Sequence, residues 1–226
     1  VETSLRQGGY GMRFRDRVEA GTLLGARLKE ETWNDPVVLG LPRGGVPVAE
    51  RVVAAIGGEL RVVITRKIGA PFNREMAIGA VGPDGKATFD LRIVRAMSID
   101  ESYIRSEVEI QMREIARRMA EYCGDAPLPK FEGRDVVIVD DGIATGHTIS
   151  AAAGYVRRHN PARTVIATPV CPPDVFEKLR HEVDRVVNVV VPARFRAVGQ
   201  FDEDFSQVSD DDVRDILARA RRGGNA

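Results

Sequence analysis

The chain has 226 residues, 43% of them hydrophobic, and its 33 lysines and arginines balance its 33 aspartates and glutamates. This length fits one large α/β domain or two small ones, and the hydrophobic share is ordinary for a globular protein with a core. A net charge of zero gives no support for nonspecific nucleic-acid binding, although it is compatible with a local basic cleft for an anionic substrate.

Short apolar runs alternate with amphipathic segments in the first half of the chain. Residues 1–11 are polar and rich in glycine, and we expect them to be an N-terminal extension of a single domain over 12–226. Apolar residues at helical periodicity predict a helix from Asp16 onward. The elements expected after it are a strand at 37–41, a helix at 46–56, a strand at 60–65, a charged loop at 66–75, and strands at 76–81 and 87–94 around a Pro-Asp-Gly turn.

In the second half, Ser98 with Glu101 forms a capping-box signature for a long charged helix that ends near Tyr122. The elements expected after it are a linker at 125–133, a strand at 136–139, a helix at 147–158, a strand at 164–170, a helix opened by Pro172 and Pro173, a strand at 185–191, and a C-terminal helix begun by Ser209 with Asp212. Strands that alternate with helices indicate an α/β fold, with an open, mostly parallel sheet flanked by helices.

The most informative segment runs from Val136 to Thr148 and reads VVIVDDGIATGHT. Its β-branched residues predict a buried parallel strand, followed by two carboxylates and a loop that opens a helix. Backbone N–H groups at a helix start can hold a phosphate dianion, and the carboxylates can accept hydrogen bonds from a vicinal diol. A P-loop is excluded because His147 stands where lysine is required, and the GxGxxG of a dinucleotide site is absent. An ordinary strand-to-helix turn with an acidic cap is the alternative.

This segment resembles the phosphoribosyl-pyrophosphate (PRPP) binding motif of type I phosphoribosyltransferases. The resemblance implies the type I fold, with a flexible loop insertion and a small C-terminal hood at about 192–226. It also implies catalytic roles for Asp140 and Asp141, which would orient the ribose and contact Mg²⁺ through ribose or water. The residues that it assigns to the 5′-phosphate are Gly142, Ala144, Thr145, Gly146, His147 and Thr148.

A second motif, Leu41-Pro42-Arg43-Gly44-Gly45, follows the first strand, at the ligand-binding edge of an open α/β sheet. It resembles the pyrophosphate loop of the xanthine–guanine branch of the family, which implies that Arg43, Gly44 and Gly45 bind pyrophosphate and that Arg43 takes part in catalysis. Arg66 and Lys67 follow the second strand and have two readings. The resemblance makes them pyrophosphate ligands, and the alternative is a solvated basic turn. Residues 68–97 correspond to the flexible loop of the family. Lys86 is a candidate functional residue of this loop, but nothing in the sequence singles it out.

The acceptor is less well defined than the PRPP site. The 6-oxopurine branches have an aspartate where this chain has Ala144, whereas the adenine branch also has alanine. His147 could replace that aspartate as a base, or it could be a solvated loop residue. Phe195 or Phe201 could stack on a flat heterocycle, or these side chains could simply fill the core of the cap.

The resemblance extends along the chain from Met12 to the C-terminal helix, within a bacterial subgroup whose acceptor is undefined. It implies an Mg²⁺-dependent phosphoribosyltransferase that moves phosphoribose from PRPP to a nitrogenous acceptor, with a purine or another nucleobase as one option. The alternatives are a non-enzymatic PRPP- or nucleotide-binding regulator on the same fold, and a hydrolase or phosphatase-like activity that no nucleophile motif supports. A homodimer is expected because this fold often dimerises.

The expected cellular location is inferred from the search for membrane spans and targeting signals in the sequence. No apolar run approaches the ~20 residues of a membrane span, and no signal peptide is visible. Cys123 and Cys171 have no metal-ligand spacing and are expected to be free thiols. We therefore expect a cytoplasmic protein without membrane or nucleic-acid partners.

Overall fold

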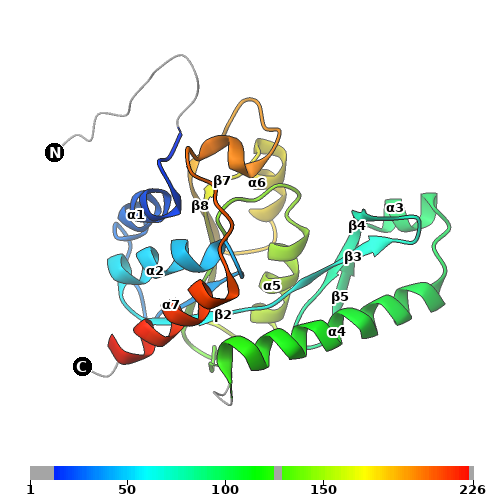
Figure 1. Ribbon diagram of the computed structural model, residues 1–226, viewed down its shortest axis with the longest axis horizontal. Helices are drawn as coiled ribbons and strands as arrows, with labels where there is room; N and C mark the ends of the chain where they lie inside the picture. Colours follow the sequence, from blue (N-terminus) through cyan, green and yellow to red (C-terminus); the bar gives the residue numbers. More distant parts are fainter. Residues whose placement is uncertain (1–12, 125–128, 224–226) are drawn as a thin grey trace.

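A computed structural model describes residues 13–124 and 129–223 (Figure 1). The extension expected at 1–11 and part of the linker expected at 125–133 lie outside these residues. At the centre is a five-stranded parallel sheet in the order β2-β1-β6-β7-β8. Its strands are β2 (Glu59–Val62), β1 (Val37–Gly40), β6 (Asp135–Val139), β7 (Arg163–Val170) and β8 (Arg185–Val190). The predicted α/β fold with an open, mostly parallel sheet is confirmed.

Helices cover both faces of this sheet (Figure 1). One face carries α1 (Arg17–Leu28), α2 (Gly45–Ile56) and α7 (Asp210–Gly223), and the other carries α5 (His147–Arg157) and α6 (Pro173–Leu179). In β6, Val137 and Val139 enter the first core, whereas Val136 and Ile138 enter the second. Because the strand is buried on both faces, its sequence is a continuous apolar run rather than an alternating pattern.

An antiparallel arm extends away from the parallel sheet (Figure 1). It contains β3 (Arg66–Ala70), β4 (Asn73–Val81) and β5 (Ala87–Phe89), then α3 (Leu91–Ala96) and the long α4 (Glu101–Cys123). The expected loop at 66–75 is wrong, because most of these residues pair in the β3–β4 hairpin. At Gly69 a Cβ would lie 2.6 Å from the Arg74 carbonyl oxygen, so glycine is what permits this close pairing.

Two further boundaries in the arm differ from expectation. The strand expected at 87–94 ends at Phe89, because Asp90 accepts hydrogen bonds from the amides of Arg92 and Ile93 and thereby caps α3. The cap of α4 is Asp100, whose carboxylate accepts from the Ser102 amide, and not Ser98 as the capping-box pattern suggested. In contrast, the capping box at the start of α7 is present, since Ser209 and Asp212 exchange backbone-to-side-chain hydrogen bonds.

The hood over the carboxyl edge of the sheet is built from both ends of the described chain. Phe14 donates its amide hydrogen to the Phe201 carbonyl at 2.7 Å and accepts from the Glu203 amide at 2.8 Å. Phe14 is buried with Phe201, next to the short helix η1 (Val198–Phe201). Helix α7 packs instead into the main core, through Val213, Ile216 and Leu217. Within the described chain, no helix is long and apolar enough to cross a membrane.

Candidate functional site

The two predicted motifs meet at one point of the sheet edge. Strands β1 and β6 are parallel neighbours whose last residues, Gly40 and Val139, are in register. Beyond that pair, the Leu41 amide donates to the Val139 carbonyl at 2.8 Å. The glycine loop that follows β1 and the acidic pair that follows β6 therefore lie side by side, as expected for the carboxyl ends of parallel strands.

Glycine is required at residues 44 and 45 because the loop passes directly over the acidic pair. A Cβ at residue 44 would lie 1.9 Å from Asp141 Oδ2, and a Cβ at residue 45 would lie 2.6 Å from the Val139 carbonyl oxygen. Neither distance is possible for a real side chain, since nonbonded heavy atoms make contact at about 3.5 Å. The sequence suggested that these glycines allow close approach to an anion, and in the structure the nearest anion is the Asp141 carboxylate.

The two carboxylates occupy different environments. Asp140 Oδ1 accepts the Asp141 amide at 2.9 Å, and no ion pair joins Asp140 to a basic side chain of the described residues. Burial raises the pKa of Asp140 well above its ordinary value, and the negative charge of Asp141 adds to this shift. Asp141 Oδ2 instead accepts from Arg17 Nε at 2.8 Å. Arg17 was not among the predicted site residues.

A small cavity of about 90 Å³ lies beside Asp140. Besides Asp140, the polar side chains that line it are Thr65, Arg66, Arg118 and Thr148. Thr65 Oγ1 donates to the Thr148 carbonyl at 3.1 Å, which joins the end of β2 to the start of α5. The pKa of Arg66 is lowered, chiefly by burial and then by the nearby charge of Arg118. Two arginines therefore line the cavity that Asp140 borders, and both are held by side chains of α4: Arg66 Nε donates to Gln111 at 3.1 Å and Arg118 Nε to Glu114 at 2.7 Å.

The loop between β6 and α5 has the geometry of an anion cradle. Gly146 adopts a left-handed conformation with φ of +77°, and α5 begins at the next residue. The amides of Ala144, Thr145 and Gly146 have no hydrogen-bond partner among the described residues. Ala144 and Thr145 are also exposed. Free amides at a helix N-terminus are suited to a phosphate group.

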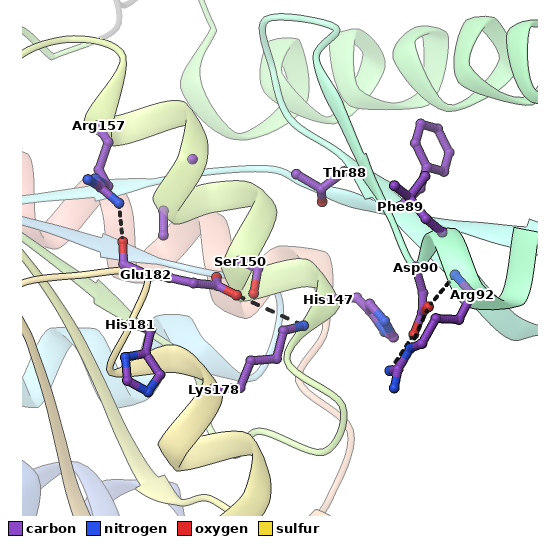
Figure 2. A pocket seen from close by; sticks show the side chains of 13 residues that line it. Thr88, Phe89, Asp90, Arg92, His147, Ser150, Arg157, Lys178, His181 and Glu182 are labelled. Atoms are coloured by element: carbon purple, nitrogen blue, oxygen red, sulfur yellow. Dashed lines mark hydrogen bonds and ion pairs between the residues drawn. The ribbon is translucent and has the colours of Figure 1, made fainter.

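His147 lines a cleft of about 550 Å³ between α5, α3 and the turn after α6 (Figure 2). Its Nδ1 lies 3.1 Å from Thr145 Oγ1, and its pKa is lowered by burial and then by the charge of Lys178. Neither carboxylate of the acidic pair borders this cleft, whereas Thr148 borders the cavity beside Asp140. This placement favours the reading in which His147 contributes its backbone rather than a basic side chain.

The charges in this cleft are only partly compensated within it (Figure 2). Lys178 Nζ lies 3.9 Å from Glu182 Oε1, and Arg92 pairs with Asp90 at 3.2 Å. Arg157 donates to the Glu182 carbonyl at 2.6 Å, and a neutral carbonyl leaves its positive charge in place.

The predicted pyrophosphate ligands are only partly brought together. Gly44, Gly45 and Arg66 lie at the acidic pair or the cavity beside it. Arg43 Nη1 lies 3.8 Å from Asp210 Oδ2, in a hollow at the start of α7. Lys67 neighbours Arg66 in β3 and is exposed, so its side chain points to the opposite face of the strand.

The aromatic residues of the hood divide into two groups. Phe195 stacks on Phe201 with ring centroids 5.8 Å apart, and Phe201 is buried, which favours the reading that these two side chains fill the core of the hood. Phe205 is 39% exposed, and its ring covers the Arg17 guanidinium at 4.0 Å. Phe205 is therefore the hood phenylalanine that reaches the acidic pair, through Arg17.

Comparison with known proteins identifies relatives of this chain. A sequence model of the phosphoribosyl transferase domain matches residues 18–205. Two curated proteins of Mycobacterium tuberculosis, MT0597 of strain CDC 1551 and Rv0571c of strain H37Rv, both provisionally named phosphoribosyl transferases, are each 41% identical over 209 residues. These matches cover 92% of this chain and 47% of each relative, so the chain spans about half the length of the curated relatives it matches.

A solved structure extends the comparison to three dimensions. The crystal structure of TT1426 from Thermus thermophilus matches with a TM-score of 0.80 at 45% identity. That match covers 92% of this chain and 99% of the other.

Proposed function

The chain belongs to the phosphoribosyl transferase family, and on that premise we propose that it transfers phosphoribose from PRPP to a nitrogenous acceptor with release of pyrophosphate. The observation that carries this proposal is the meeting of the two motifs, with the backbone of Gly44 and Gly45 against Asp140 and Asp141. That arrangement brings a glycine loop, two carboxylates and two arginines together at one edge of the sheet, which supports the proposal.

In the proposed reaction, the bond between C1′ of ribose and the pyrophosphate oxygen breaks, and a bond from C1′ to the acceptor nitrogen forms. The free amides of residues 144–146 would hold the 5′-phosphate. Asp140 and Asp141 would accept hydrogen bonds from the ribose hydroxyls. Arg66 and Arg118 would stabilise the charge that develops on the departing pyrophosphate, and the acceptor would lose its N–H proton to solvent or to a base.

The cavity beside Asp140 must widen for this chemistry. Its volume of about 90 Å³ is far below the ~300 Å³ at the lower end of small-molecule sites. Its lining comes from the loop after β1, the end of β2 with the base of the arm, α4, Asp140 after β6 and Thr148 of α5. We propose that PRPP binding moves the loop or the arm outward and that closure over the ligand then excludes water.

Magnesium is part of the proposal. In the described chain no group of three or more histidine, cysteine or acidic side chains is arranged to hold a metal ion. Mg²⁺ is commonly held through one or two carboxylates together with substrate phosphates, and it keeps several waters. Asp140, which has no cation of its own among the described residues, and the adjacent Asp141 fit that mode through ribose or water. When bound, the ion would neutralise charge on the pyrophosphate.

The acceptor is proposed only by class. Ala144 stands where the 6-oxopurine branches have an aspartate, which argues against a 6-oxopurine as the acceptor. Other nucleobases and small nitrogenous compounds remain as acceptor classes. The exposed ring of Phe205 is the hood surface that could contact a flat acceptor.

The test is pyrophosphate release from PRPP with Mg²⁺, measured against a panel of nucleobases and small amines. Release that depends on one acceptor, and that the Asp140→Asn/Asp141→Asn double variant lacks, would establish the activity. PRPP binding without turnover of any acceptor would instead favour the regulator.

A further inference from the structure

One side chain outside the two motifs connects three parts of the site. Arg17, the first residue of α1, donates from Nε to Asp141 Oδ2 at 2.8 Å and from Nη1 to the Ser206 carbonyl at 2.7 Å. The face of its guanidinium lies 4.0 Å from the centre of the Phe205 ring. One planar cation thus binds the acidic pair and the hood at the same time.

This contact is well shielded from solvent. The side chain of Arg17 is 12% exposed and that of Asp141 is 16% exposed. In that setting the hydrogen bond between two ionised groups is stronger than a surface ion pair, and loss of either partner leaves the other poorly compensated. Asp202 lies in the same charged cluster and has a buried Oδ1 with no hydrogen-bond partner in the described chain. Arg17 therefore pairs directly with Asp141 and opposes the effect of burial on Asp202 more strongly than Arg13 does.

We propose that Arg17 is a positioning residue of the PRPP site. It holds Asp141 in the orientation that accepts the ribose hydroxyls and fixes the Phe205–Ser206 segment of the hood above that carboxylate. The inference rests on the proposed function, because it assigns to Asp141 the ribose contact proposed above. Arg17 acts through Asp141 and the hood and does not itself contact the pyrophosphate.

Ligand affinities of single variants test this role. Arg17→Met is expected to weaken the binding of PRPP and of ribose 5-phosphate about tenfold or more, and to leave pyrophosphate binding within about twofold, as measured by calorimetry. Arg17→Lys keeps the charge but loses the planar fork, so we expect an intermediate loss in the same ligand order. The matched control is Arg27→Met on the same helix, since Arg27 is exposed and donates only to the Asn188 carbonyl, at 2.9 Å, within the described chain.

A double-mutant cycle separates positioning from a general effect on folding. If Arg17 acts through Asp141, the Arg17→Met/Asp141→Asn variant binds ribose 5-phosphate no more weakly than Asp141→Asn alone. Additive losses, or equal losses for all three ligands, would overturn the proposal. If Arg17→Met is too unstable for binding measurements, Arg17→Lys replaces it in the ligand comparison and in the double-mutant cycle. If the wild-type protein does not bind PRPP, the proposed function is refuted. If the wild type and Arg17→Met bind PRPP with equal affinity, only the role of Arg17 is refuted.

Discussion

Gly44 and Asp141 are in such close contact that a methyl group at residue 44 would lie 1.9 Å from the Asp141 carboxylate oxygen. The two residues are far apart in the sequence and come from different motifs. Their contact means that the glycine loop and the acidic pair cannot move independently. A ligand that displaces one of them must also affect the other.

This contact predicts the effect of Gly44→Ala. The added Cβ must displace either the loop or the Asp141 side chain, at a cost of about 1–3 kcal/mol in the free energy of unfolding. It should also weaken PRPP binding, because the carboxylate loses its position. Gly154→Ala is the matched control, since a Cβ there meets only the flexible end of Arg158, at 3.3 Å. Denaturant unfolding measures the change in stability, and calorimetry measures the change in PRPP affinity. A Gly44→Ala protein as stable as the control would show that the loop can move to accommodate the added methyl group.

The acidic pair predicts a second result. Replacing Asp140 and Asp141 with asparagine keeps the shape of the site but removes both charges, so we expect PRPP affinity to fall on the order of 100-fold, from the loss of two charged hydrogen-bond acceptors. Asp174→Asn, an exposed acidic residue in the first turn of α6, is the control. Unchanged PRPP affinity of the double variant in calorimetry would refute the assignment of this site.

The sequence was sufficient for the sheet and the two motifs, because their signals are local. A strand buried on both faces is a continuous apolar run, as at 136–139, and a loop at its carboxyl end shows its chemistry in consecutive residues. The first strand of the hairpin at 66–81 was missed because β3 is short, begins with two charged residues and is irregular at Gly69. In such a hairpin pairing depends on the partner strand rather than on local propensity.

The residues that sequence reasoning missed are held by contacts with no local signature. Arg17 and Asp141 are 124 positions apart, and only the packing of α1 beside the hood brings them together. Arg118 is one arginine among many in a charged helix, and nothing in its spacing separates it from the exposed ones. Arg43 was correctly placed on the loop, but its partner, Asp210, lies at the start of the last helix.

The position of Arg43 leads to a third prediction. Arg66→Met should weaken pyrophosphate binding about tenfold and leave ribose 5-phosphate binding within about twofold, because Arg66 borders the cavity beside Asp140. Arg43→Met should weaken pyrophosphate binding less, because Arg43 is paired with Asp210. Calorimetry with each ligand tests the order. A larger loss for Arg43→Met would mean that the ligand draws this side chain away from Asp210.

Asp202 predicts how stability depends on pH. This residue is 4% exposed, and burial, opposed by Arg17 and reinforced by Asp141, raises its pKa from 3.8 to about 6. The folded protein therefore holds this proton more tightly than the unfolded chain, so the contribution of Asp202 is most favourable below pH 4 and is lost as the pH rises toward 6. Asp202→Asn should be more stable than the wild type above pH 6, by on the order of 1–3 kcal/mol, with the difference shrinking below pH 4.

Denaturant unfolding of Asp202→Asn and the wild type across this pH range measures the difference. Asp204→Asn is the control of opposite sign, because a hydrogen bond from Ser206 lowers the pKa of that exposed carboxyl. A difference between Asp202→Asn and the wild type that does not change with pH would show that Asp202 is already ionised in the folded protein near pH 4. The buried carboxyl would then be compensated fully by Arg17 and Arg13, the two cations that oppose the effect of burial on its pKa.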